Sequence, residues 1–388
     1  MTAGEVADGA GAIIARAAER TRCAVCDGTA FDSLLTLERV PVYMGCTDAD
    51  PSTDAFADQI WCTCSRCGAP QLRFLPPLDL VYAGQHNVAL GGVWERHHHA
   101  LVRFLGVSPG ERVVEIGGST GALARIALEE GRAAAWTVVE PNPTFVPGGG
   151  IHLVEAFIED VPDVLDSADL IVHSHVLEHL YEPRAFLATV AQGSAPEARM
   201  VLSVPNLPEV LNLSGSNALN FEHTYYFGLP ELLWMLGDAG FVVEAFQRFE
   251  DHSLHVRARR RGDAQESTAP ADASHGARAL HAFVDAARRD AETLATRAAA
   301  YQGDIYLFGG HVFSQFLLVC GFPAGLVSGV LDNDRAKQGR RLYGTSLIVE
   351  SPELLRNRSG AAVVVRAAHY TPEVTAQLRD IAPDVDIW

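Results

Sequence analysis

A buried strand that runs into a glycine-rich turn and then a helix constrains the fold of this chain most strongly. Residues 113–116 are apolar enough for a buried strand, and residues 122–129 have the composition of a helix. Gly117, Gly118 and Gly121 occupy the turn between them. Glycine lets the backbone approach a ligand closely at the carboxyl end of such a strand. We therefore expect an α/β fold with a doubly wound sheet and a ligand site at this turn.

The glycine spacing limits which ligand this turn can hold. The sequence Gly-Gly-Ser-Thr-Gly lacks the G-x-G-x-x-G spacing of a dinucleotide pyrophosphate site, which disfavours an NAD-dependent oxidoreductase. The next predicted strand, residues 136–140, ends in Glu140. A carboxylate at that position can accept both ribose hydroxyls of a nucleoside. The two features predict a cofactor that contains a nucleoside, with Pro141 and Phe157 as its neighbouring loop and apolar wall.

Residues 169–180 predict a further part of the cofactor site. They read Asp-Leu-Ile-Val-His-Ser-His-Val-Leu-Glu-His-Leu, which is typical of a strand, a loop and the start of a helix. Together with the E-I-G-x-x-x-G turn, this segment resembles the class I S-adenosylmethionine-dependent methyltransferases, and the resemblance implies S-adenosylmethionine as the cofactor. The alternative for Glu178 and His179 is a helix cap on a solvated face. The candidate cofactor-binding residues are Glu115, Gly117, Gly118, Gly121, Glu140, Pro141, Phe157, His175 and Glu178.

The cysteines predict a metal site rather than disulfides. Six of the seven lie within residues 23–67, which in a cytoplasmic chain is typical of metal binding. Two C-x-x-C pairs can bring four thiolates to one tetrahedral zinc ion, and a closed four-thiolate site leaves no open position for catalysis. The alternative is a set of buried free thiols. The predicted ligands of a structural zinc ion are Cys23, Cys26, Cys64 and Cys67.

Residues 217–227 carry the candidate chemistry. They contain a Glu-His pair beside two tyrosines, and methyl transfer requires a base placed to remove a proton from the acceptor. We expect His223 to be the general base and Glu222 to assist it; the alternative is a structural histidine with aromatic packing. The candidate catalytic residues are His223, Glu222, Tyr82 and Tyr226. The candidate substrate-binding residues are His86, Asn87, Asn206, Asn220 and Tyr225.

Charge and hydropathy disfavour several kinds of partner. The net charge is −18 at pH 7, whereas a protein that reads a phosphate backbone needs a basic face. No apolar run is long enough to cross a bilayer, and the N-terminus lacks the pattern of a secretory signal. We expect a cytoplasmic protein that acts on a small molecule, as a monomer or homodimer, without nucleic-acid or membrane partners.

Composition shifts divide the chain into five segments. Turn-rich sequence surrounds the cysteines, alternating strand and helix patterns follow, and a polar, proline- and alanine-containing linker precedes a second, smaller α/β region. We expect an N-terminal tail at 1–20, a zinc-binding domain at 21–78, a methyltransferase domain at 79–258, a linker and helix at 259–303, and a Rossmann-like domain at 304–388.

This order of domains is similar to that of the sugar C-methyltransferases of deoxysugar pathways. The resemblance covers residues 21–388 and includes both cysteine pairs, the glycine turn and the C-terminal stretch 331–339. It implies methyl transfer to a nucleotide-linked sugar in natural-product or surface-sugar biosynthesis, with a C-terminal domain that helps to enclose the substrate or is purely structural. The family's active-site stretch reads Y-H-E-H-x-x-Y-F, but its first two positions are Asn220 and Phe221 here. The departure keeps two alternatives open, namely O- or N-methyl transfer to another small molecule and a non-catalytic zinc-containing binding protein.

Overall fold

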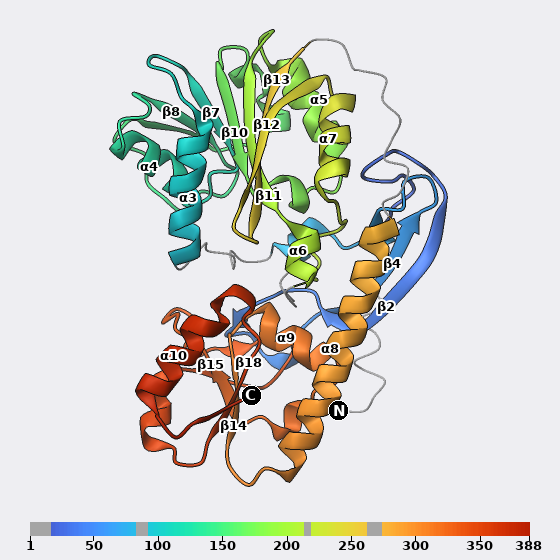
Figure 1. The fold of residues 1–388 in the computed structure, drawn as a ribbon, viewed down its shortest axis with the longest axis vertical. Helices are drawn as coiled ribbons and strands as arrows, with labels where there is room; N and C mark the ends of the chain where they lie inside the picture. Colours follow the sequence, from blue (N-terminus) through green and yellow to red (C-terminus); the bar gives the residue numbers. More distant parts are fainter. Residues whose placement is uncertain (1–16, 83–91, 213–218, 262–273) are drawn as a thin grey trace.

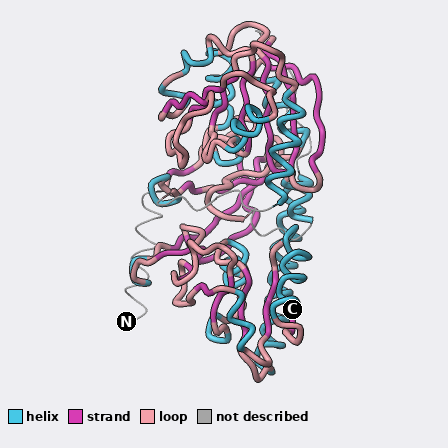
Figure 2. The backbone as a smooth tube through the Cα atoms, turned by 90° about the vertical axis from the view of Figure 1, so that its left-hand side faces the viewer, coloured by secondary structure: helices cyan, strands magenta, loops and turns pink. Residues whose placement is uncertain are grey.

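The two largest sheets of this protein lie in separate α/β units. In Figure 1 the larger unit lies above the smaller one, and the long helix α8 (Ser274–Ala300) and the strands of the N-terminal region lie beside their junction. Figure 2 shows the same two tiers from the side. The candidate substrate-binding residues His86 and Asn87 lie outside the described residues. The computed structural model describes residues 17–82, 92–212, 219–261 and 274–388.

A seven-stranded sheet forms the base of the larger unit. Its order is β12-β13-β11-β10-β7-β8-β9; the strands from β11 to β9 are parallel, and β13 is antiparallel to both of its neighbours. The chain leaves β7 for β8 on one side and later returns to β10 on the other. This reversal of strand order opens a crevice at the carboxyl ends of β7 and β10. The strands are β7 (Val113–Ile116), β8 (Trp136–Val139), β9 (Ile151–Val154), β10 (Leu170–Ser174), β11 (Arg199–Pro205), β12 (Phe241–Phe249) and β13 (Ser253–Arg260).

Helices cover both faces of this sheet. Helices α3 and α4 pack on the face that presents Val113 and Leu170, and α5 and α7 pack on the face that presents Val114 and Ile171. Because neighbouring residues of a strand point to opposite faces, these apolar strands are buried on both sides. The doubly wound α/β fold expected from the sequence is confirmed. The helices are α3 (Gly92–Leu105), α4 (Ala122–Glu129), α5 (Pro183–Gly193), α6 (Leu207–Asn212) and α7 (Leu229–Asp238).

The smaller unit has a five-stranded parallel sheet of order β17-β15-β14-β18-β19. Its first strand, β14, is central, so this sheet also has a reversal of strand order at its carboxyl edge. The strands are β14 (Ile305–Phe308), β15 (Gly329–Leu331), β17 (Val349–Glu350), β18 (Ala362–Val365) and β19 (Asp386–Ile387). The accompanying helices are α9 (Val312–Val319) and α10 (Thr371–Ile381).

The N-terminal region is a long hairpin that contacts both units. Strands β2 and β4 form the hairpin, and β5 extends it into a three-stranded sheet. Strand β3, near the hairpin tip, pairs with β16 of the smaller unit. The strands are β1 (Ala18–Glu19), β2 (Phe31–Pro41), β3 (Cys46–Thr47), β4 (Phe56–Cys64), β5 (Pro70–Leu72), β6 (Phe74–Leu75) and β16 (Arg341–Leu342), and helix α2 (Leu78–Val81) follows them.

A buried ion pair anchors the hairpin tip to the smaller unit. The Arg341 guanidinium donates two parallel hydrogen bonds to the Asp54 carboxylate, at 2.6 and 2.7 Å. The two side chains are 7% and 2% exposed. The backbone N–H of Gly344 also donates to Asp54, at 2.8 Å. This contact fixes the position of the smaller unit relative to the rest of the chain.

The substitution Asp54→Ala should destabilise the protein strongly. It leaves the Arg341 guanidinium buried without its counter-charge, which typically costs about 3–5 kcal/mol. Urea unfolding measures the loss. The matched control is Asp48→Ala, which removes an exposed partner of Arg340 at 3.0 Å and should cost less than about 1 kcal/mol. Equal stabilities for the two variants would contradict the anchoring role.

Candidate active site

A cleft of about 640 Å³ lies between the two α/β units. Both units line it with the carboxyl ends of their first strands: Gly117 follows β7, and Phe308 ends β14. The larger unit contributes, among others, Glu115, Gly117, Gly118, Ser119, His175, Glu178, His179, Asn220 and His223. The smaller unit contributes, among others, Gly309, His311, Asp332, Asn333, Lys337, Tyr370 and Gln377. The cleft can therefore hold two ligand groups that face each other.

At two positions of the turn after β7, no residue other than glycine fits. A Cβ atom at Gly117 would lie 2.5 Å from Val176 Cγ2, and one at Gly118 would lie 2.4 Å from Val138 Cγ1. Gly117 also has a φ of 78°, which disfavours other residues. Both positions are therefore packed too closely against neighbouring side chains for a residue with a Cβ atom, and the two glycines line the cleft.

Glu140 lies immediately beyond β8 and holds the same turn. Its two carboxylate oxygens accept hydrogen bonds from the backbone N–H groups of Ser119 and Asn142, each at 2.9 Å. A carboxylate has about four lone-pair positions, so each oxygen can still accept a ribose hydroxyl. Glu140 itself does not line the cleft, so its role as an acceptor of ribose hydroxyls stays a prediction.

Glu115 is buried at the end of β7 and lines the cleft beside the turn. Burial raises the pKa of its carboxyl to about 7, although the hydrogen bond from Trp136 Nε1, at 2.8 Å, acts in the opposite direction. A cationic ligand group at this position would keep the carboxylate ionised. Three other cofactor candidates, Gly121, Pro141 and Phe157, do not line the cleft, and Phe157 is 56% exposed.

Histidines and carboxylates gather at the carboxyl end of β10. His179 Nδ1 lies 3.5 Å from Glu222 Oε2 and 3.2 Å from the Tyr82 hydroxyl. The rings of His179 and His223 are 4.8 Å apart, centre to centre. Glu178 completes this group, which we call the His-Glu cluster (Tyr82, Glu178, His179, Glu222 and His223). The structure thus brings together three of the four predicted catalytic residues, Tyr82, Glu222 and His223.

The side chain of Asn220 holds the backbone of two residues of the His-Glu cluster. Its Oδ1 accepts hydrogen bonds from the N–H groups of Glu222, at 2.8 Å, and His223, at 2.9 Å. This is an Asx-type turn, in which an asparagine oxygen substitutes for a backbone carbonyl. The residue that departs from the family motif therefore positions the motif's Glu-His pair.

His223 is held in the form that can accept a proton. Burial lowers the pKa of its imidazole to about 4, helped by His179 and opposed by Glu178 and Glu222. Its Nδ1 is enclosed and has no hydrogen-bond partner among the described residues. Nε2 is therefore the nitrogen that we assign to the side of a ligand.

Tyr225 and Tyr226 have packing roles in the structure, unlike the roles proposed for them from the sequence. Tyr225 is fully buried, donates its hydroxyl to the Leu177 carbonyl at 2.6 Å and stacks on Phe227. The Tyr226 ring packs edge-on against Trp61 with centroids 5.3 Å apart. Neither tyrosine lines the cleft. Local sequence placed them beside His223 but could not show which way their rings point.

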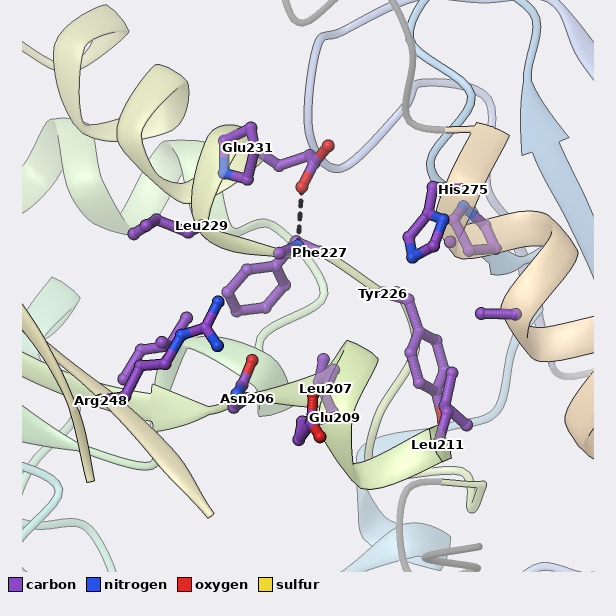
Figure 3. Close-up of a pocket in the computed structure, with 16 residues that line it drawn as sticks. Asn206, Leu207, Glu209, Leu211, Tyr226, Phe227, Leu229, Glu231, Arg248 and His275 are labelled. Atoms are coloured by element: carbon purple, nitrogen blue, oxygen red, sulfur yellow. Dashed lines mark hydrogen bonds between the residues drawn. The ribbon is translucent and has the colours of Figure 1, made fainter. Parts of the chain in front are cut away.

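A second cavity, of about 330 Å³, lies behind the segment that carries His223. Figure 3 shows Tyr226 and Asn206 on its wall, together with Arg248 and His275. Asn206 was a candidate substrate-binding residue, but it lines this cavity and not the cleft.

The four cysteines of the two C-x-x-C pairs lie together and are all buried. Their sulfur atoms are all within 4.8 Å of one another. Thiolates in this arrangement are the preferred ligands of a structural zinc ion. The two other cysteines of this region point elsewhere: the Cys46 thiol donates to the Gly310 carbonyl and the Cys62 thiol to the Gln71 carbonyl. The residues present therefore fit one zinc ion with four sulfur ligands.

The strand that follows the second cysteine pair braces the His-Glu cluster. The N–H of Leu72 in β5 donates to the Thr224 carbonyl, and the N–H of Tyr226 donates to the Pro70 carbonyl, each at 2.8 Å. The Arg20 guanidinium also donates to Thr224 Oγ1, at 3.0 Å. These contacts surround His223 in the chain, so the order of the cysteine site and the position of His223 are coupled.

The sequence allowed the C-terminal domain to help enclose the substrate, but it did not single out which of its residues line the site. Lys337 is the only lysine in the chain, and it lines the cleft. Its Nζ lies 3.2 Å from Asp332 Oδ2, and the same oxygen accepts the Gly310 N–H at 2.7 Å. The available sequence signal was the stretch Leu-Asp-Asn-Asp at residues 331–334, which contains Asp332 and lies just before Lys337. A cation at this wall is suited to an anionic part of a substrate.

A cluster of aromatic and imidazole rings forms the wall of the cleft beside α3. The Trp94 ring lies 4.8 Å from the rings of both His175 and His252, and 5.3 Å from that of His97. His97 is fully buried, and its Nε2 hydrogen-bonds with Ser203 Oγ at 2.8 Å. Burial lowers the pKa of His97 far below its usual range, so its ring is neutral.

Acid should destabilise the protein because two fully buried histidines are held neutral. Burial lowers the pKa of His173 to about 4, and burial together with His175 lowers that of His255 to about 4. The unfolded chain protonates both near their usual pKa of about 6.5, and therefore binds more protons below that pH. The contribution to stability is fully present above about pH 6.5 and is lost as the pH falls towards 4, by about 1.4 kcal/mol per pH unit for each group.

Urea unfolding at neutral pH and near pH 5 measures this loss. The variant His255→Phe, whose ring can stack on Phe249 as the imidazole does, should lose a smaller free energy between the two pH values. Equal pH dependence in the variant and the original protein would contradict the assignment to His255.

Two family models match the chain in succession. A methyltransferase domain matches residues 93–245, and a C-methyltransferase C-terminal domain matches residues 246–385. The C-methyltransferase NovU of Streptomyces niveus is 25% identical over 359 residues, which cover 80% of each chain.

Comparison with solved structures finds methyltransferases that cover part of this chain. An S-adenosylmethionine-dependent methyltransferase from Mesorhizobium loti is 19% identical and covers 44% of this chain and 99% of its own, with a TM-score of 0.36. A putative methyltransferase from Bacillus halodurans is 10% identical and covers 43% of this chain and 99% of its own, with a TM-score of 0.35.

Within the described part of the chain, none of the helices combines the length and apolarity that crossing a membrane requires.

Proposed function

Because the chain is an S-adenosylmethionine-dependent methyltransferase with a C-methyltransferase C-terminal domain, we propose that it methylates a carbon atom of a nucleotide-linked deoxysugar. The observation that carries this proposal is the shared cleft, which is lined by the glycine turn, by Glu178, His179 and His223 of the His-Glu cluster, and by Lys337 beside Asp332, Asp334 and Glu373 of the smaller unit. The resemblance to sugar C-methyltransferases supplies the substrate class. The similarity to NovU, a C-methyltransferase by name, agrees with transfer to carbon.

The cofactor belongs on the wall of the larger unit. S-adenosylmethionine supplies an activated methyl group when bound. In our assignment, the bare backbone of Gly117 and Gly118 lies against it, Glu140 accepts its ribose hydroxyls and Glu115 faces its ammonium group. This set fits the cofactor because the carboxylates offer acceptors where a nucleoside and an amino group need them.

The His-Glu cluster supplies the base. A carbon next to a keto group loses its proton to His223 Nε2, and the electron pair of the C–H bond moves towards the keto oxygen. The Tyr82 hydroxyl is suited to donate a hydrogen bond to that oxygen, because a phenol is protonated at neutral pH and this hydroxyl lies 3.2 Å from His179 Nδ1. Tyr82 would thereby take over the role of the family tyrosine that Asn220 replaces.

The smaller unit would hold the nucleotide part of the substrate. Lys337 presents a cation to the cleft, and the turn after β14 presents backbone at Gly309. Asp332, within hydrogen-bond distance of Lys337, fixes the ammonium group beside this turn. A diphosphate is the anionic group that we assign to this wall.

A comparison of acceptors tests the proposal. The protein is incubated with S-adenosylmethionine and either a thymidine-diphosphate-linked 4-keto-6-deoxyglucose or the same keto sugar without its nucleotide, and mass spectrometry detects the added methyl group. We expect methylation of the nucleotide-linked sugar, and a higher KM for it in Lys337→Met. The control Arg335→Met alters an exposed cation outside the cleft. Equal methylation of both sugars would contradict the role of the smaller unit.

A further inference from the structure

We propose that Glu178 is a positioning residue whose buried carboxylate stabilises the imidazolium that forms when His223 removes a proton. The proposal rests on the function proposed above, because it concerns the step in which the acceptor carbon loses its proton. It replaces the sequence-based assignment of Glu178 as a cofactor ligand.

Glu178 lines the cleft, but its carboxylate oxygens are enclosed. Glu178 lies in a short 3-10 helix (Leu177–His179) and is fully buried. Both of its carboxylate oxygens are enclosed, and among the described residues none donates a well-aligned hydrogen bond to them. A cofactor atom cannot reach these oxygens without displacing the surrounding side chains. Direct binding of the cofactor by this carboxylate is therefore disfavoured.

Imidazole rings surround this enclosed carboxylate. His175 Nδ1 lies 3.0 Å from Glu178 Oε1. One oxygen of Glu178, one ring nitrogen of His179 and one of His223 all lie within 4.8 Å of one another. Three histidines from the β10 end and the His223 segment thus converge on one carboxylate.

Electrostatics favour the ionised form of Glu178 in this setting. Burial alone would raise its pKa, but His175, His179 and His223 lower the pKa of the carboxyl to about 2. A buried anion without aligned donors is costly unless a cation lies nearby. A positive charge on His223 supplies that cation, so the anion stabilises the protonated base more than the neutral one.

The proton-transfer step can be written with this counter-charge in place. The acceptor C–H bond breaks, its electron pair forms the enolate, and the proton goes to His223 Nε2. The imidazolium then faces the carboxylates of Glu178 and Glu222 and the rings of His179 and His175. Glu178 remains ionised throughout and exchanges no proton with the substrate. The same interaction lowers the energy of the step in which charge separates.

Hydrogen–deuterium exchange isolates this step from methyl transfer. The protein is mixed with S-adenosylhomocysteine and the thymidine-diphosphate-linked 4-keto-6-deoxyglucose in D₂O, and NMR follows loss of the proton signal next to the keto group. We expect Glu178→Gln to slow the exchange at saturating substrate by about 10- to 100-fold. Glu178→Asp keeps the charge and should retain more of the rate. Glu182→Gln makes the same change at an exposed residue nearby and should exchange like the original protein.

Two further readouts separate this role from its rivals. Calorimetry with S-adenosylhomocysteine should give the same affinity for Glu178→Gln as for the original protein, which also shows that the variant is folded. An unchanged exchange rate with weakened cofactor binding would overturn the proposal in favour of a cofactor ligand. Metal analysis that finds an ion lost with Glu178 would overturn it in favour of a metal site. If the original protein itself neither exchanges nor methylates this sugar, the proposed function fails first, and the role of Glu178 with it.

Discussion

Replacing His223 with asparagine should lower kcat by about 10²- to 10⁴-fold while leaving the affinity for S-adenosylhomocysteine unchanged. A positioned general base contributes an acceleration of this size, and the asparagine amide cannot accept a proton near neutral pH. His223 lines the cleft but lies outside the turn that we assign to the cofactor. Steady-state rates with saturating nucleotide-linked keto sugar measure the effect, and calorimetry measures cofactor binding.

His152 offers the matched control for this experiment. It is an exposed histidine on β9, away from the cleft, and His152→Asn should keep the full rate. A His223→Asn variant that retains more than about a tenth of the original kcat would contradict the base assignment, because the remaining groups would then suffice for proton removal.

Loss of one cysteine ligand should have the largest effect on the folding of the N-terminal region. We propose that Cys23, Cys26, Cys64 and Cys67 bind a structural zinc ion, and such sites contribute about 10 kcal/mol or more to folding. Cys26→Ser should therefore release zinc and unfold the hairpin that carries β5. Because β5 forms backbone hydrogen bonds with Thr224 and Tyr226, activity should fall as well. Elemental analysis and Trp61 fluorescence follow the two events, since Trp61 is fully buried in β4.

Cys62 provides a control of the same chemistry. It is buried next to the site but lies outside both C-x-x-C pairs, and its thiol donates to the Gln71 carbonyl. Cys62→Ser should keep one zinc ion per chain and most of the activity. Absence of zinc from the original protein, or an equal loss of zinc in both variants, would contradict the four-cysteine assignment.

Local sequence was sufficient for the features that depend on neighbouring residues. The glycine turn, the acid after the second strand and the C-x-x-C pairs each need a fixed spacing along the chain, and the structure brings these residues into the expected arrangements. The contacts that exclude a Cβ atom at Gly117 and Gly118 come from Val176, after β10, and Val138, in β8, the two strands that flank β7. Patterns of this kind follow from backbone geometry and are readable without a tertiary structure.

The remaining parts of the site depend on contacts between distant segments. Lys337 reaches the cleft only because the hairpin tip, through Asp54 and Arg341, holds the smaller unit against the larger one. Likewise, residues two positions apart can lie in different surroundings. His223 lines the cleft, whereas Tyr225 is enclosed and donates its hydroxyl to the Leu177 carbonyl. Side-chain direction after an Asx turn is set by packing, which spacing alone does not specify.

Asn220 shows how a departure from a motif can be misjudged from sequence. Compared with the family's active-site stretch, Asn220 stands where the family has a tyrosine. In the structure its side chain holds the backbone of Glu222 and His223, and Tyr82 lies close to the same cluster through His179. In our account Tyr82, from another segment of the chain, therefore donates the hydrogen bond that the family tyrosine would donate. Carbon remains the proposed acceptor of the methyl group.

The position of the new methyl group tests this account most directly. The protein is incubated with S-adenosylmethionine labelled in its methyl group and the nucleotide-linked keto sugar, and NMR of the purified product shows the atom to which the label is bonded. We predict a methyl group bonded to the sugar carbon next to the keto group, with no proton left on that carbon from the abstraction step. A labelled methyl group on oxygen or nitrogen would contradict the central claim and favour the alternative transfer to a heteroatom.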